Sequence, residues 1–127
     1  MSTLSFRRVQ HVSITRPRGS EEQTRRFYGE TLGLAEVPVP ETLGHLQLIW
    51  YGIGADELHL VAEDNVDNTG SGRHLCIEVD DLEALRRRLA AGEIEVRETT
   101  PIPGRPRFFC TDPFGNGIEF TQFEAAQ

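Results

Sequence analysis

Three histidines and one glutamate stand at matching places in the two halves of the sequence. His11 and His74 each lie near the start of a half, and His59 and Glu119 each lie near the end of one, at nearly the same spacing. Imidazole nitrogens and a carboxylate together suit Zn²⁺, Fe²⁺, Ni²⁺, Co²⁺ or Mn²⁺. If the four side chains meet, we expect them to bind one divalent transition metal ion, with positions left for water or two oxygens of a small-molecule substrate.

Each candidate ligand lies in a segment in which apolar and polar residues alternate. Successive side chains of a strand point to opposite faces, so each ligand is predicted to lie on the polar face of its strand. The segment before Glu119 contains turn residues at 112–116, which predicts a tight turn leading into a strand. The apolar neighbours are Val12 and Ile14 for His11, Leu58 and Leu60 for His59, Leu75 and Ile77 for His74, and Ile118 and Phe120 for Glu119.

The elements that carry these residues recur as two copies of one pattern, a strand, a helix and three strands. The copies span about residues 7–63 and 72–124, separated by a linker rich in Asp, Asn, Gly and Ser. The chain of 127 residues is therefore predicted to form a single α+β domain with an internal repeat. The predicted strands are 9–15, 34–39, 46–51, 57–61, 73–79, 94–97, 107–111 and 117–121.

One helix is predicted in each copy, with recognisable start and stop signals. If each helix covers the apolar outer face of its strands, the polar faces become the walls of a cleft shared by the two copies. His11, His59, His74 and Glu119 are then expected to point into this cleft. The start signals are capping boxes formed by Ser20 with Gln23 and by Asp80 with Glu83, and the stop signals are Gly33 and Gly92.

The composition excludes several classes of function. The net charge is −7, with 20 acidic against 13 basic residues, which disfavours nucleic acid or an anionic membrane as a partner. All basic residues are arginines, so Schiff-base lysine chemistry and a P-loop lysine are excluded. Cys76 and Cys110 form no spaced pair, and no apolar stretch is long enough to span a bilayer. We expect a soluble cytoplasmic protein without disulfides.

Some other side chains are weaker candidates. Trp50 and Phe109 could line a pocket, although strand aromatics are core residues more often than not. Glu78 could orient a ligand histidine, and Cys76 is expected to pack rather than to bind metal. His45 is expected to be solvated. The arginines in or beside loops that could rim the cleft are Arg16, Arg18, Arg105 and Arg107.

The matched positions, with RFYGETLGL at 26–34 and DPFGN at 112–116, resemble the vicinal-oxygen-chelate superfamily. This superfamily includes glyoxalase I, methylmalonyl-CoA epimerase, fosfomycin-resistance proteins, extradiol dioxygenases and bleomycin-binding proteins. The resemblance covers nearly the whole chain. It implies two paired βαβββ modules forming a curved, eight-stranded mixed sheet around a cleft, with the helices on the outer face. It also implies that His11, His74 and Glu119 bind metal. His59 takes the fourth position, where glyoxalases more often have Glu and epimerases Gln.

The resemblance implies a metal-dependent lyase or isomerase of the glyoxalase type, acting on a small substrate that chelates the metal through vicinal oxygens. A metal-bound hydroxide, or a displaced carboxylate such as Glu119, would then take the proton next to the carbonyl. Two alternatives stay open: an Fe(II) extradiol-type dioxygenase using His11, His74 and Glu119, and a non-catalytic antibiotic-binding or resistance protein. A homodimer is expected, because an open curved sheet needs its edges covered and relatives do this by pairing. The residues do not indicate a thiol cofactor.

Overall fold

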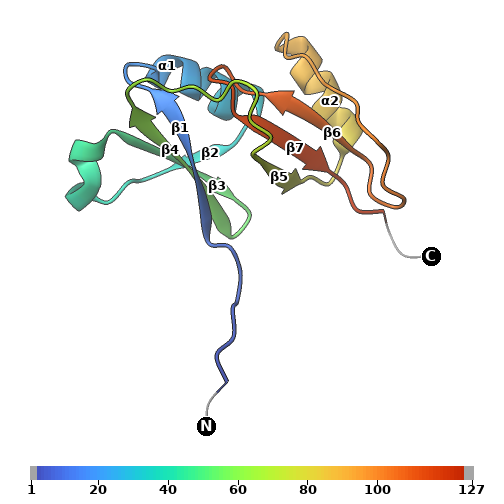
Figure 1. Cartoon of the computed structure of the whole chain (residues 1–127), viewed down its shortest axis with the longest axis horizontal. Helices are drawn as coiled ribbons and strands as arrows, with labels where there is room; N and C mark the ends of the chain where they lie inside the picture. The colour runs from blue at the N-terminus through green and yellow to red at the C-terminus, as the bar shows by residue number, and fades with distance from the viewer. Residues whose placement is uncertain (1–2, 125–127) are drawn as a thin grey trace.

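The computed structural model describes residues 3–124, whose elements form two modules, one from each half of the chain (Figure 1). The first module consists of the strand β1 (His11–Pro17), the helices α1 (Glu21–Thr24) and η1 (Arg25–Thr31), the strand β2 (Ala35–Val37), the 3-10 helix η2 (Glu41–Leu46), and the strands β3 (Leu48–Ile53) and β4 (Asp56–Glu63). The second consists of the strand β5 (His74–Glu78), the helix α2 (Leu82–Ala91), and the strands β6 (Arg107–Thr111) and β7 (Gly117–Thr121).

The strands form two mixed sheets of the same design. The first sheet has the order β1-β4-β3-β2 and the second has the order β5-β7-β6. In each sheet the first strand pairs in parallel with the last one, and the other pairings are antiparallel. The α+β class and the two βαβββ-like modules are thus confirmed. The prediction of one joined eight-stranded sheet is wrong, because residues 3–124 form a four-stranded and a separate three-stranded sheet.

The strand predicted at 94–97 is reduced to a single bridge between Arg97 and Phe109. The backbone N–H of Ile94 donates instead to the carbonyl of Leu89, at 2.8 Å, and so helps to end α2. Glu93, with φ of 61°, takes the left-handed conformation that lets the chain turn back there. The segment therefore uses its first residues to terminate the helix, and too few remain to pair along β6.

The apolar faces of both sheets pack against the helices in one hydrophobic core. Phe27 and Tyr28 of η1 and Leu82 and Leu89 of α2 belong to the same buried cluster as the inward residues of the strands. The predicted alternation holds, because Leu58 and Leu60 are buried in this core while His59 lies on the opposite face. Both cysteines are free, as expected. Among residues 3–124, no helix is long and apolar enough to cross a membrane.

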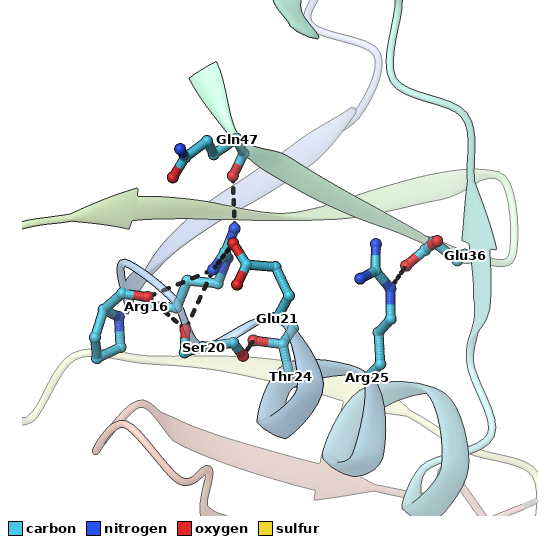
Figure 2. Close-up of polar contacts among 8 residues, drawn as sticks. Arg16, Ser20, Glu21, Thr24, Arg25, Glu36 and Gln47 are labelled. Carbon is cyan, nitrogen blue, oxygen red and sulfur yellow. Dashed lines mark hydrogen bonds and ion pairs between the residues drawn. The ribbon is translucent and has the colours of Figure 1, made fainter. Parts of the chain in front are cut away.

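The first helix begins differently from the prediction. The Ser20 side chain makes no capping hydrogen bond to the helix; it accepts a hydrogen bond of 3.2 Å from Arg16 (Figure 2). Arg16 lies on the core face of β1, fully buried, and also donates to the carbonyl of Gln47 at 2.7 Å. Glu21 lies 3.4 Å from the same guanidinium. Arg16 therefore fastens the end of β1 to the starts of α1 and β3 and does not rim a cleft.

The second helix shows a smaller difference. Its N-cap is Asp81 rather than Asp80, and the Asp81 carboxylate accepts a hydrogen bond from the backbone of Ala84 at 3.0 Å. The predicted stop at Gly33 is confirmed by its φ of 77°. At the end of α2, however, the left-handed residue is Glu93 and not Gly92, whose φ is −88°.

A buried carboxylate in the turn between β6 and β7 joins the two modules. Asp112 accepts hydrogen bonds from the backbone N–H groups of Phe114 and Asn116, and from the Asn116 side chain. It also accepts one from the hydroxyl of Tyr28, at 2.6 Å, which comes from η1 in the first module. Asn116 in turn donates to the carbonyl of Thr15 in β1 at 2.8 Å. The turn that leads to Glu119 is thereby attached to both the helix and the edge strand of the first module.

This network predicts unequal effects for two neighbouring buried tyrosines. Burial, with a smaller contribution from Asp112, raises the pKa of Tyr28 well above its usual value, so Tyr28 is a stable donor. Tyr28→Phe leaves Asp112 without that donor and should lower the free energy of unfolding by about 1–3 kcal/mol. The Tyr51 hydroxyl is equally buried but has no hydrogen-bond partner within residues 3–124. Tyr51→Phe should therefore be neutral or stabilising in urea denaturation; equal losses in both variants would contradict the network.

Candidate functional site

The register of the two sheets places the four candidate ligands at equivalent positions. In the first sheet Ser13 of β1 lies opposite His59 of β4, and in the second Cys76 of β5 lies opposite Glu119 of β7. His11 and His74 precede Ser13 and Cys76 by two residues, and so lie on the same faces as His59 and Glu119. Each module thus presents a pair, one residue from its first strand and one from its last.

In the first module the histidine pair is part of an aromatic stack. The rings of His11 and His59 are stacked with centroids 4.1 Å apart, and the ring of Trp50 stacks on His59 at 3.9 Å. Both planes are nearly parallel to that of His59, so its two faces are covered and only its edge is accessible. His59 is accordingly 7% exposed, and the indole N–H of Trp50 is buried without a hydrogen-bond partner among the described residues.

Hydrogen bonds give the two stacked histidines different roles. The Nε2 of His59 lies 2.9 Å from the Glu57 carboxylate, to which it can only donate. The Nδ1 of His11 lies 2.6 Å from the side-chain oxygen of Gln10, also an acceptor, which leaves Nε2 of His11 as the nitrogen with a free lone pair. The bond to His59 is the main reason that the pKa of Glu57 lies below its usual value. We call His11, His59 and Glu57 the first half-site.

In the second module a histidine and a carboxylate face each other. Nε2 of His74 and Oε1 of Glu119 are 3.2 Å apart, and Nδ1 of His74 lies 3.0 Å from the carbonyl oxygen of Gly72. The carbonyl requires a proton on Nδ1, so a neutral ring would direct its Nε2 lone pair at the carboxylate. Two acceptors at this distance need a cation between them, either a proton or a metal ion. We call His74 and Glu119 the second half-site.

The surroundings of Glu119 leave one of its oxygens for that cation. The carboxylate is 6% exposed, and its Oε2 accepts a hydrogen bond of 3.2 Å from Arg107, whose guanidinium also donates to the carbonyl of Thr100. Burial and the charge of Glu119 raise the pKa of the Cys76 thiol on the adjacent strand, so Cys76 is not an activated nucleophile. Oε1 therefore remains for the cation shared with His74.

The imidazole nitrogen of His74 and the carboxylate oxygen of Glu119 are suitable ligands for a transition metal, and the distance between them fits a shared ion. Two ligand atoms at about 2.0–2.1 Å from a tetrahedral ion lie about 3.3 Å apart, close to the 3.2 Å between Nε2 of His74 and Oε1 of Glu119. Within a single chain, the site contains only this pair of facing ligands. Within residues 3–124, no three His, Cys, Asp or Glu side chains are grouped so that they could hold an ion. The four predicted residues are thus brought together as two half-sites and not as one cluster.

Sequence reasoning missed Glu57 of the first half-site and Gln10, which bonds to His11. Glu57 lies two residues before His59 on the same strand face and opposite His11 in the register, a signal visible in the alternation alone. Gln10 lies outside the polar face by periodicity, and only the structure shows its bond to His11. Trp50 and Phe109 line the two half-sites, since Trp50 stacks on His59 and Phe109 packs edge-on against His74. His45 is exposed in η2, as expected.

Comparison with known proteins identifies the architecture. Residues 8–120 match the family model described as glyoxalase/bleomycin resistance protein/dioxygenase superfamily. A crystal structure of a Bacillus anthracis protein assigned to the glyoxalase family is 33% identical, with a TM-score of 0.90 over 97% of this chain and 100% of that one. No curated protein sequence matches this chain significantly.

Two further solved structures share the fold with proteins of different roles. TnmS3, an antibiotic binding protein from Streptomyces sp. CB03234, is 26% identical, with a TM-score of 0.72 over 96% of this chain and 100% of that one. A lactoylglutathione lyase from Agrobacterium tumefaciens is 20% identical, with a TM-score of 0.69 over 91% and 92% of the two chains, which shows the fold alone.

The hydrogen bonds in the first half-site predict opposite tautomers for two stacked rings. We expect neutral His59 to carry its proton on Nε2, because Glu57 accepts it, and neutral His11 to carry its proton on Nδ1, because Gln10 accepts it. Long-range ¹H–¹⁵N correlation spectra distinguish the two forms. Glu57→Ala should turn His59 into a mixture of tautomers and leave His11 unchanged. An Nδ1-protonated His59 in the unaltered protein would contradict this assignment.

Proposed function

The chain belongs to the glyoxalase/bleomycin resistance protein/dioxygenase superfamily, and from this we propose that it is a metal-dependent lyase or isomerase of the glyoxalase type. Its proposed substrate is a small molecule that presents two vicinal oxygens to the metal. The observation that carries the proposal is the facing pair of acceptors, Nε2 of His74 and Oε1 of Glu119, which needs a cation between its members.

The proposed ligands are His11, His59, His74 and Glu119, binding one divalent ion of zinc, nickel, cobalt, manganese or iron. His11 and His74 have their Nδ1 atoms held by acceptors and their Nε2 atoms available, the usual arrangement of a metal-bound histidine. His59 must exchange its bond to Glu57 before its Nε2 can bind, so we expect it to contribute least. When bound, such an ion would polarise substrate oxygens and stabilise negative charge on them.

Because the half-sites are separate within one chain, we propose that the protein is a homodimer in which the first half-site of one copy meets the second half-site of the other. The described sheets have four edge strands, β1, β2, β5 and β6, and two of them, β1 and β5, carry His11 and His74. Each complete dimer would then contain two equivalent sites, as required by two-fold symmetry.

Glu119 is the proposed catalytic base. Its Oε2 accepts a hydrogen bond from Arg107, which fixes the carboxylate while Oε1 stays directed toward His74. Once substrate displaces its Oε1 from the metal, this carboxylate could take a proton from the carbon next to a substrate carbonyl and return it to a neighbouring atom. The stack of Trp50, His59 and His11 on the facing half-site would exclude water from one side of the bound substrate.

A second function is favoured by one specific observation, the aromatic stack itself. The outer face of Trp50 or of His11, at either end of the stack, could stack on a planar ligand without a metal. The protein from Streptomyces described as antibiotic binding shares 26% identity with this chain. In that case the protein would sequester a small aromatic molecule, and His74 and Glu119 would hold a proton between them.

Metal content is the first test. Elemental analysis of untagged protein, purified without added metal and then titrated, should give about one transition-metal ion per chain. Glu119→Gln, His74→Gln and His11→Gln should each weaken binding by about tenfold or more, and His59→Gln by less. His45→Gln, on an exposed histidine outside both half-sites, is the matched control and should bind normally. Iron as the native metal would favour the dioxygenase alternative.

The chelating mode of the substrate has a separate test. Acetohydroxamate offers two adjacent oxygens, so calorimetry should detect its binding to the metal-loaded protein and not to the protein treated with a chelator. Absence of metal in every preparation and titration would contradict the proposal, and tight metal-independent binding of planar aromatic molecules would support sequestration instead.

A further inference from the structure

The antiparallel pairing of β6 with β7 continues into the loop before β6 and the segment after β7. Figure 1 shows these two segments together at one end of the second module, the loop in orange and the end of β7 in red. Within this extension Arg105 lies opposite Phe123. The backbone hydrogen bonds that place them there run from Gln122 to Pro106 at 3.1 Å and from Glu124 to Gly104 at 3.0 Å.

Arg105 lies on the same face of the sheet as the second half-site. Side chains two residues apart on a strand share a face, so Arg105 shares the face of Arg107, which donates to the carboxylate of Glu119. On the neighbouring strand β5, Cys76 lies opposite Glu119 and is exposed. Burial and Glu119 raise the pKa of the Cys76 thiol, and the nearby charge of Arg105 partly opposes this rise. Arg105 therefore borders the open face beyond Glu119.

The guanidinium of Arg105 has no acidic partner among residues 3–124. Its Nε is buried without a hydrogen-bond partner, and its central carbon lies 5.4 Å from the centre of the Phe123 ring. Arg107 differs, because its guanidinium forms an ion pair with Glu119. Glu78 lies on the same face of β5, but it is exposed and forms no ion pair with another described residue. The two Nη atoms of Arg105 are thus the donors left for a ligand.

A carboxylate is the ligand that fits these donors. The planar fork of a guanidinium matches the two oxygens of one carboxylate, whereas a phosphate dianion bound by a single arginine would keep an uncompensated charge. The ring of Phe123 is 51% exposed and offers an apolar surface beside Arg105 for the carbon chain that carries the carboxylate. The net charge of −7 disfavours anions over most of the protein, so an arginine without an acidic partner gives this site its preference for them.

We propose that Arg105 binds a carboxylate of the substrate, whose two vicinal oxygens lie at the metal held by His74 and Glu119. The substrate is then a carboxylic acid that carries its chelating oxygens at the opposite end of a short carbon chain. Phe123 follows Glu119 by four residues, about 13 Å along an extended strand, which limits the length of that chain. Arg105 determines specificity and takes no part in proton transfer. This inference rests on the proposed function, because the metal fixes the other end of the substrate.

Calorimetry with carboxyalkyl hydroxamates of increasing chain length tests the carboxylate site on the metal-loaded protein. Each compound is compared with the analogue that has an uncharged amide in place of its carboxylate. The best carboxylate should bind about tenfold more tightly than its amide, because hydrogen bonds from arginine to a charged oxygen are stronger. Arg105→Gln should abolish this preference and leave acetohydroxamate binding unchanged, and Arg105→Lys should keep part of it. Arg87→Gln, on an exposed arginine of α2, is the matched control and should keep the full preference. Thermal unfolding confirms that the variants are folded.

A second measurement needs no metal. In ¹H–¹⁵N spectra of the metal-free protein, the Nε–H signal of Arg105 is identified by its loss in Arg105→Gln. This signal should shift on titration with glutarate and not with glutaramide. Equal affinity for carboxylate and amide, a preference that survives in Arg105→Gln, or no shift with glutarate would each overturn the proposal. The two claims fail separately: acetohydroxamate binding without a carboxylate preference refutes only the role of Arg105, and a glutarate-induced shift in a protein that binds no metal refutes only the proposed function.

Discussion

The buried carboxylate of Asp112 is the constraint on which the relative placement of the two modules depends. It accepts hydrogen bonds from the turn that follows it and from Tyr28 in the first module, and Asn116 extends the same network to the β1 backbone. Removing one hydrogen-bond donor from a buried carboxylate lowers the free energy of unfolding, because the unpaired oxygen stays out of water. Each of these bonds therefore helps to stabilise the same network. The start of β7, and with it Glu119, is therefore positioned by residues of the other module, not by its own sheet alone.

The two half-sites differ although their strand positions are equivalent. In the second, an imidazole nitrogen faces a carboxylate oxygen, and only a cation satisfies both. In the first, His59 occupies the place that corresponds to Glu119, is covered by Trp50 and His11, and already donates to Glu57. One half is thus suited to hold a cation and the other to present the edges of stacked rings and one free nitrogen. A complete site needs both, which makes association of two chains part of the proposed function.

Much of this arrangement could be predicted from the sequence, because it follows from local alternation. The faces of His59 and Glu119, the two-module order and the helix end at Gly33 all depend on neighbouring residues. The errors concern distant partners. Ser20 looked like a helix cap, but Arg16 and Pro17 take its hydroxyl. Ile94 looked like the start of a strand, but its N–H ends α2. The separation of the sheets and the bond between Gln10 and His11 also depend on packing that no local pattern encodes.

The central claim is that one site is built from halves of two chains, and mixed dimers test it most directly. His11→Ala chains and Glu119→Ala chains, carrying different tags, are co-expressed, and the heterodimer is isolated for elemental analysis. If each site combines the first half-site of one chain with the second half-site of its partner, both substitutions fall in the same site of the heterodimer and the second site stays intact. The heterodimer should then bind about half the metal of the unaltered dimer. Both single-variant homodimers should bind little. A heterodimer as empty as the homodimers would contradict the account, because it would mean that each site lies within one chain.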